Sequence, residues 1–240
     1  MALFFLLLGD SYFIHILNHP LMCKCLEVDS IVKSFGNIYL LTDIYLCCKP
    51  GERIAIFGRN GCGKSTLLKI IFGTMTSERS FIRINGKVQT HKAFLSGQIA
   101  YLPQHHFLPP ELPIKEVIKL YINSNPENFL KDKHLSHIED SKIKDLSGGE
   151  LRYLEIKLLL LSSHMYIMLD EPFNGLSPIC CESVRELIYK ASSTKGIIFT
   201  DHNFREIHKI ANRILLLDQG YLKEIKDSTE LKPFGYSSNY

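Results

Sequence analysis

The apolar residues of this chain fall into short, nearly continuous runs, separated by longer stretches in which apolar and charged residues mix. Such runs are typical of strands that are buried on both faces of a parallel sheet. They occupy residues 53–57, 99–102, 165–169, 196–200 and 213–217. The stretches between them predict helices, at 66–71, 114–121, about 146–161, 180–191 and 204–211. The alternation predicts an α/β fold around a mixed, mainly parallel sheet.

Two regions depart from this rhythm. From 26 to 48 the apolar positions partly alternate around a turn at Asn37, which predicts an antiparallel β layer. From Gln104 to about residue 145 the chain is more polar, and three prolines between 109 and 113 exclude regular helix there. We therefore predict a helical insert at about 105–161. A hairpin turn at 218–220 and a short tail at 227–240 complete the predicted domain, which spans 22–240.

The first 21 residues differ from the rest, because a strongly apolar run at 3–8 is soon interrupted by polar residues. A membrane span needs about 20 predominantly apolar residues. A secretory signal would have a cationic start, whereas the first lysine is Lys24. A weak membrane-surface anchor and a packed or disordered extension are two interpretations. We favour a third, that 1–21 is not native and that the protein starts at Met22.

Composition sets only broad limits. A chain of 240 residues can form one large α/β domain or two small ones. The net charge of +3 and the lack of a long basic run give no reason to expect a nucleic-acid partner. The seven cysteines are odd in number and form no C-x-x-C pattern, which is typical of reduced thiols in the cytosol.

The first candidate site is a glycine-rich segment between the predicted strand 53–57 and the helix after it. It reads Gly58, Arg59, Asn60, Gly61, Cys62, Gly63, Lys64, Ser65 and Thr66. This fills the phosphate-loop pattern G-x-x-x-x-G-K-[ST], in which backbone N–H groups surround phosphate oxygens at a helix N-terminus. Lys64 would add a charge between the outer phosphates and Ser65 would ligate Mg²⁺. The segment predicts an ATP site.

The segment 146–152 reads Leu-Ser-Gly-Gly-Glu-Leu-Arg and opens a predicted long helix. Ser147 and Glu150 have the spacing of a capping box, which is a purely structural explanation. A cap does not need Gly148 and Gly149, however. Bare N–H groups at a helix start favour the approach of an anion, so Ser147, Gly148 and Gly149 are a second candidate site for phosphate.

Asp170 and Glu171 follow the apolar run 165–169. Two carboxylates at the end of a buried strand are costly in a core and favourable beside a cation. Since side chains alternate along a strand, the two should take different roles. We assign Asp170 to the shell of Mg²⁺ and Glu171 to the attacking water, as general base or orienter.

Taken together, these stretches resemble the ATP-binding cassette ATPases, the nucleotide-binding subunits of ABC transporters. The resemblance covers roughly residues 26–226. It rests on the phosphate loop, on Tyr101-Leu102-Pro103-Gln104, on 146–150, on 166–172 and on Thr200-Asp201-His202, in that order. The run 200–206 is similar to that of lipopolysaccharide-export and branched-chain amino-acid systems. The implied fold is a P-loop NTPase of the ABC type, with an antiparallel β layer and a helical subdomain.

The resemblance also implies roles that the residues alone do not fix. Phe35 would stack on adenine, Gln104 would join the shell of Mg²⁺ and water, and His202 would contact the γ-phosphate. The segment 147–149 would complete the site of a second protomer, so that two Mg-ATP are held in a dimer of two copies or of paired ABC subunits. A separate transmembrane permease would hold the dimer at the cytoplasmic, inner face of the cell membrane.

Two positions depart from the family pattern. Glu150 stands where the family has Gln, and Ser177 stands where it commonly has Asp. The alternative function is a soluble, non-transport ABC-type ATPase in translation or DNA maintenance. Those relatives usually carry paired cassettes or long coiled coils, whereas this chain has one cassette and no sustained heptads.

Overall fold

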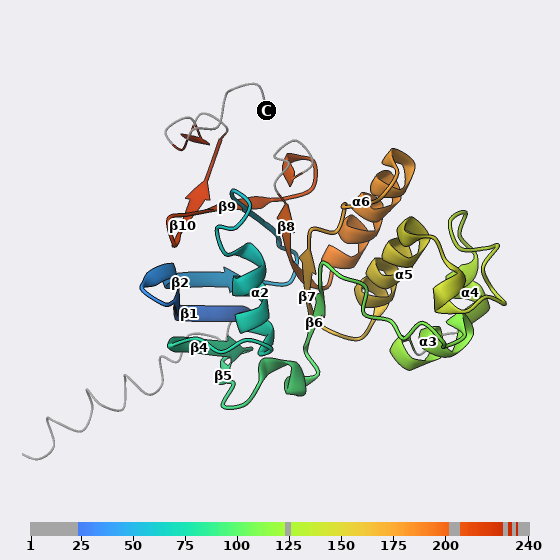
Figure 1. The fold of residues 1–240 in the computed structure, drawn as a ribbon, viewed down its shortest axis with the longest axis horizontal. Coiled ribbons are helices and arrows are strands. Elements are labelled where there is room, and N and C mark those ends of the chain that lie inside the picture. Colours follow the sequence, from blue (N-terminus) through green and yellow to red (C-terminus); the bar gives the residue numbers. More distant parts are fainter. Residues whose placement is uncertain (1–23, 123–125, 202–206, 228–229, 232–233, 235–240) are drawn as a thin grey trace, which may run out of the picture.

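The computed structural model describes residues 24–122, 126–201, 207–227, 230–231 and 234 of the chain. The interpretations of 1–21, of His202, of the start of the 204–211 helix and of most of the tail concern residues outside this part. The described strands form two sheets, one of six strands and one of four (Figure 1).

The six-stranded sheet holds the apolar runs. Its strands are β3 (Arg53–Phe57), β6 (Ile99–Leu102), β7 (Tyr166–Asp170), β8 (Gly196–Asp201), β9 (Arg213–Asp218) and β10 (Tyr221–Ile225), in the order β10-β9-β3-β8-β7-β6. Only β10 is antiparallel to its neighbour. Gln219 and Gly220, which join β9 to β10, have φ of 48° and 83°, as a two-residue hairpin turn requires. The predicted mixed sheet and hairpin are confirmed.

The four-stranded sheet is antiparallel throughout and confirms the predicted β layer. It consists of β1 (Leu26–Phe35), β2 (Ile38–Cys48), β4 (Arg79–Ile84) and β5 (Lys87–Val88), in the order β2-β1-β4-β5. β1 and β2 are longer than the sequence pattern indicated. Bulges in their pairing interrupt the alternation of side chains, which explains why the apolar pattern there looked like several short strands.

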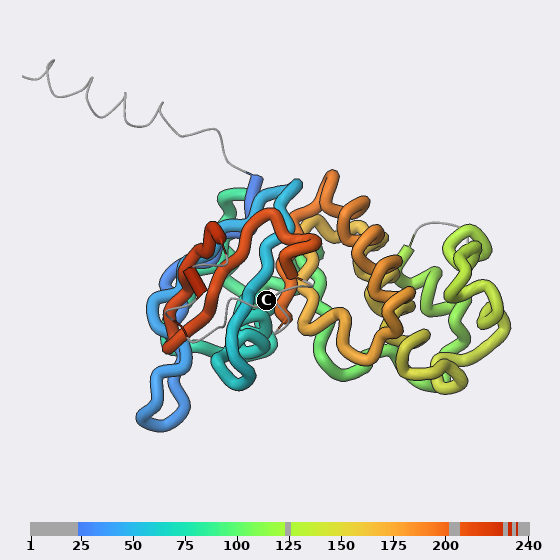
Figure 2. The backbone as a smooth tube through the Cα atoms, turned by 90° about the horizontal axis from the view of Figure 1, so that it is seen from above, coloured from blue at the N-terminus to red at the C-terminus, as the bar shows by residue number. Residues whose placement is uncertain are grey.

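Helix α2 (Lys64–Phe72) covers one face of the six-stranded sheet, and α5 (Gly148–Leu161) and α6 (Pro178–Ser192) cover the other (Figures 1 and 2). Helices α3 (Ile114–Tyr121) and α4 (Pro126–Leu130) lie beyond α5, away from the sheet, and the described part of the chain also has the 3₁₀ turns η1 (Ala93–Ser96) and η2 (Ile143–Asp145). Two hydrophobic clusters result. Along β3, Ile54 and Ile56 join α2 and the antiparallel layer, whereas Ala55 and Phe57 join α5 and α6. The strand ends carrying the motifs are therefore fixed from both sides.

The predicted insert is helical only in part. Between Gln104 and α5 the described helices are α3, α4 and the turn η2, and much of the remaining chain is loop. Nor is the insert mainly polar in its packing, because Ile114, Ile118, Phe129 and Leu135 are buried in the cluster that contains α5. These apolar residues are widely spaced in the sequence, so the pattern does not show that they are buried together. They extend the hydrophobic core of the main domain.

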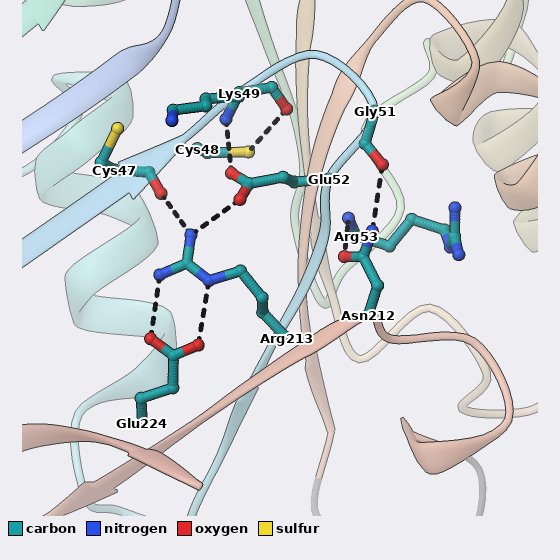
Figure 3. A network of polar contacts seen from close by, with 9 residues as sticks. All are labelled: Cys47, Cys48, Lys49, Gly51, Glu52, Arg53, Asn212, Arg213 and Glu224. Atoms are coloured by element: carbon teal, nitrogen blue, oxygen red, sulfur yellow. Dashed lines mark hydrogen bonds and ion pairs between the residues drawn. The ribbon is translucent and has the colours of Figure 1, made fainter. Parts of the chain in front are cut away.

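The side chain of Arg213 joins the two sheets (Figure 3). It donates to the Cys47 carbonyl at 2.9 Å and to the Glu52 carboxylate at 3.0 Å, and forms a two-point pair with Glu224 of β10. Arg213 also holds the pKa of Glu224 below its ordinary value near 4.5, chiefly through these hydrogen bonds. The end of β2 is thus connected to the edge of the six-stranded sheet.

Replacing Arg213 with Met should lower the free energy of unfolding by about 1–2 kcal/mol, because the Cys47 carbonyl and the Glu52 carboxylate lose a donor. The change is read from urea denaturation curves. Arg83→Met is the matched control: Arg83 is similarly exposed and pairs only at the surface, with Glu27 and Asp29, so its loss should cost about 0.5 kcal/mol or less. Equal losses in both variants would contradict the role of Arg213.

The Arg213–Glu224 pair makes the stability of the protein depend on pH. Since the pKa of Glu224 is lowered in the folded protein, the stability it contributes is present above its ordinary value near 4.5 and is lost as the pH falls through the lowered value. The difference in stability between wild type and Arg213→Met should therefore shrink below about pH 4.5.

Candidate functional site

The glycine-rich segment 58–66 joins β3 to α2, as the sequence predicts. Gly61 and Gly63 have φ of 82° and 111°, in the left-handed region that favours glycine. A Cβ on Gly58 would lie 2.5 Å from the Leu217 carbonyl of β9, and one on Gly63 would lie 3.1 Å from the Leu40 and Leu41 side chains. The loop therefore fits closely between β9 and the antiparallel layer, with its backbone N–H groups at the start of α2.

Lys64 is the first residue of α2 and is 6% exposed. Its ammonium group donates to the Gly58 carbonyl at 2.7 Å and to the Arg59 carbonyl at 3.1 Å. The positive charge is thus held across the concave side of the loop, which is where a phosphate bound by the loop would lie.

A cavity of about 370 Å³ opens at this loop. Its walls come from three parts of the chain: the loop and the start of α2, the segment after β6, and the end of β7. The lining residues are Asn60, Gly61, Gly63, Lys64, Ser65, Thr66, Gln104 and Glu171. The structure thus brings together most residues that the sequence predicts for one site. Gly58 and Cys62 belong to the loop but do not line this cavity, and burial raises the pKa of the Cys62 thiol.

Asp170 lies beside this cavity at the end of β7 and is completely buried. Its carboxylate accepts hydrogen bonds from the hydroxyls of Ser65 (3.0 Å), Thr200 (2.7 Å) and Tyr101 (3.0 Å). Burial, and then Asp170, raises the pKa of Tyr101, which keeps that hydroxyl a donor. Three donors offset the cost of burying the carboxylate.

A carboxylate hydrogen-bonded to the Ser65 hydroxyl at a phosphate loop fits Mg²⁺, which proteins bind through one or two carboxylates together with phosphate oxygens. Among the described residues no group of three or more His, Cys, Asp or Glu gathers as it would in an all-protein metal cage.

Glu171 reaches the cavity from an unusual backbone conformation. Its φ is 47°, a left-handed value that costs on the order of 1 kcal/mol for a residue other than glycine. Two side chains hold it: the Thr200 hydroxyl accepts from the Glu171 N–H at 3.0 Å, and Arg152 donates to the Glu171 carbonyl at 3.1 Å. The strain is therefore located at the residue that we assign to the attacking water.

The second candidate site lies at the start of α5 and does not line the cavity. The predicted capping box is present: Ser147 caps the helix through the Glu150 N–H, and the Glu150 carboxylate accepts from the Ser147 N–H at 2.8 Å. The Ser147 hydroxyl also donates to the Glu150 carboxylate, and this bond, followed by that from the Ser147 N–H, is the main cause of the lowered pKa of Glu150. A Cβ on Gly148 would meet no atom within 4 Å, and one on Gly149 would lie 3.5 Å from the Gly175 carbonyl. Nothing in the described part of the chain requires glycine at either position.

Two further predicted residues stand apart from the cavity. Phe35 ends β1, is 55% exposed as a residue and has the Lys33 ammonium 4.9 Å from its ring centre. Ser177, at the position where the resemblance led us to expect Asp, caps α6 by accepting from the Cys180 N–H at 3.3 Å. Serine and aspartate are both strong N-caps, so this local role survives the exchange.

The sequence reasoning missed Tyr101, Thr200 and Arg152 as site residues. Tyr101 and Thr200 are predicted only as strand residues, although they lie near strand ends, shortly before Gln104 and His202. Arg152 is two residues past Glu150, and its local pattern does not predict its burial. All three contact Asp170 or its neighbour Glu171.

Comparison with known proteins agrees with these observations. The family model described as ABC transporter matches residues 41–174. The lipopolysaccharide export system ATP-binding protein LptB of Escherichia coli strain K12 is 29% identical over 222 residues, covering 86% of this chain and 92% of that protein. The corresponding protein of Acidithiobacillus ferridurans is also 29% identical, over 214 residues, covering 83% of this chain and 88% of that one.

Comparison with solved structures also finds ATP-binding cassettes of ABC transporters. An ATP-binding subunit of an ABC transporter matches with a TM-score of 0.75 and 26% identity, covering 88% of this chain and 93% of the other. A dimeric bacterial ABC transporter cassette, MJ0796, matches in fold with a TM-score of 0.72 and 23% identity, covering 84% and 98%. Within the described part of the chain, no helix is long and apolar enough to cross a membrane.

Proposed function

Because this chain belongs to the ABC transporter family, as an ATP-hydrolysing subunit, we propose that two copies of it, or it and a paired ABC subunit, close around two Mg-ATP and drive a separate membrane permease. The observation that carries the proposal is the cavity in which the phosphate loop, Gln104 and Glu171 meet, while the glycines at the start of α5 lie outside it. The alternative, a soluble non-transport ABC-type ATPase in translation or DNA maintenance, is not favoured by the relatives found.

The residues at the cavity have different proposed roles in binding and hydrolysing ATP. The N–H groups of 60–66 and the Lys64 ammonium would bind the phosphates, and Ser65 with Asp170 would hold Mg²⁺, which would neutralise the charge that develops during phosphoryl transfer. Glu171 and Gln104 both line the cavity. Glu171 is assigned to the attacking water, as general base or orienter, and Gln104 to the shell of Mg²⁺ and water. Phe35 provides an exposed ring for adenine, and His202 is assigned to the γ-phosphate from the sequence resemblance alone.

The start of α5 supports the dimer. Its N–H groups carry a positive partial charge, and Gly148 leaves them bare although an alanine would fit the fold. An anion site that does not line its own chain's nucleotide cavity is explained if it binds the ATP held by a second subunit. We propose that the permease then docks this dimer at the cytoplasmic face of the membrane, through the insert and the segment near Gln104.

Replacing Gly148 with Asp tests the dimer. The side chain enters open space, and its charge is favourable at a helix start, so the melting temperature should stay unchanged or rise slightly. The same charge would repel the γ-phosphate of the partner's ATP. We expect nucleotide binding by the monomer to persist, and both ATP-dependent dimerisation, measured by size-exclusion chromatography with light scattering, and turnover to be lost.

Val88→Asp is the matched control, because it adds the same charge at an exposed position of β5, in the antiparallel layer. It should dimerise and hydrolyse ATP as wild type does. A Gly148→Asp protein that dimerises normally would remove α5 from the shared site.

A further inference from the structure

Arg152 is a buried cation on α5 that donates hydrogen bonds to backbone carbonyls around the nucleotide cavity. Its side chain is 4% exposed. It donates to the Pro103 carbonyl at 2.6 Å, to the Asp170 carbonyl at 2.7 Å and to the Glu171 carbonyl at 3.1 Å. One guanidinium therefore connects three elements that are far apart in sequence: the start of α5, the end of β6 and the end of β7.

The carbonyls that Arg152 contacts flank the residues assigned to the attacking water. Pro103 directly precedes Gln104, and Asp170 directly precedes Glu171. The planar, five-donor guanidinium can hold both segments at once, which the single ammonium nitrogen of a lysine cannot do with the same geometry. Arg152 thus fixes the distance between the Gln104 loop and the Glu171 backbone.

Glu155, one turn further along α5, holds the other side of the same loop. It is completely buried, accepts from the Phe107 N–H at 2.8 Å and lies 3.0 Å from the His106 ring nitrogen Nδ1. It is also 3.7 Å from the Arg152 guanidinium, which compensates both buried charges. The loop around Gln104 is therefore held on both sides by α5.

Lys157 shows what a buried cation on α5 does when its role is structural. It is 6% exposed, and its ammonium donates to the Phe129 carbonyl at 2.6 Å and to the Asp132 carboxylate at 2.8 Å. Both partners belong to the insert, and none lines the nucleotide cavity. Arg152 and Lys157 thus share a helix and a degree of burial but hold different parts of the molecule.

We propose that Arg152 is a positioning residue for ATP hydrolysis: it aligns Glu171 and Gln104 with each other and connects both to α5, whose Ser147 end receives the partner's ATP. This rests on the proposed function.

The test compares Arg152→Lys and Arg152→Gln with Lys157→Gln. For the Arg152 variants we expect the dissociation constant for ATP, from equilibrium titration, to stay close to that of wild type. We expect kcat to fall by about 10²-fold, since displacing a catalytic group by about 1 Å has effects of this size. KM should change little, which is the pattern for loss of an interaction needed only in the transition state. Lys157→Gln should lower the melting temperature by about as much as the Arg152 variants do, but it should keep kcat near that of wild type.

A second measurement separates positioning from general destabilisation. With Glu171 intact, the Arg152 variants should accumulate an ATP-bound dimer in light scattering, because they bind nucleotide but do not consume it. A destabilised site would instead bind less ATP and form less dimer. If the Arg152 variants keep kcat, or lose ATP binding and kcat together, the inference is wrong although the proposed function stands. A wild-type protein that neither binds nor hydrolyses ATP would instead overturn the proposed function.

Discussion

Replacing Glu171 with Gln should abolish ATP turnover while leaving ATP binding intact. Glutamine has nearly the same shape and can still occupy the wall of the cavity, but it cannot take a proton from water. Loss of a general base costs about 10²–10⁴-fold in rate. Since the phosphate loop, Lys64 and Asp170 are untouched, nucleotide affinity should be unchanged, and the ATP-bound dimer should persist instead of separating after hydrolysis.

Two measurements check this expectation. Phosphate release under saturating Mg-ATP gives kcat, and light scattering before and after ATP addition gives the population of dimer. Glu150→Gln is the matched control, because it makes the same chemical change at the capping box of α5, outside the cavity. It should retain turnover. Hydrolysis by Glu171→Gln at the wild-type rate would take Glu171 out of its assigned role.

Replacing Lys64 with Ala should weaken ATP binding itself. The buried ammonium supplies charge-assisted hydrogen bonds, each of which contributes about 1.5–3 kcal/mol, so the dissociation constant should rise by about 10–10²-fold. Turnover then falls as a consequence at cellular ATP concentrations. Equilibrium titration with a fluorescent ATP analogue measures the affinity directly.

Lys69→Ala provides the comparison, because Lys69 lies in the last turn of the same helix, away from the cavity. It should leave ATP affinity unchanged. If Lys64→Ala and wild type give the same titration curve, the phosphate-loop interpretation is wrong, whatever happens to the rate.

Local pattern was sufficient for the parts of the site that are contiguous in sequence. The strand, loop and helix around Lys64, the capping box at Ser147 and the strand end at Asp170 are all where the sequence places them. Each is decided by residues within a few positions of one another: glycines where the loop needs them, a hydroxyl and a carboxylate three apart, and an apolar run followed by acids.

The buried charges of α5 were not predictable from spacing, because their partners are distant in sequence. Arg152, Glu155 and Lys157 contact the segment after β6, the end of β7 and the insert. The sequence does indicate that α5 is an interior helix, because apolar residues recur all around it and leave almost no polar face. Charged residues on such a helix have no solvent to face and must find partners inside.

The place of β3 in the sheet has a consequence for synthesis of the protein. β3 carries the phosphate loop, yet both of its neighbours, β8 and β9, come from the last quarter of the chain, and Gly58 lies directly against the Leu217 carbonyl. On the ribosome the loop therefore emerges long before the strands that hold it. A nascent chain that already contains the phosphate loop has no shaped pocket until β9 has left the exit tunnel, so nucleotide cannot stabilise it before then.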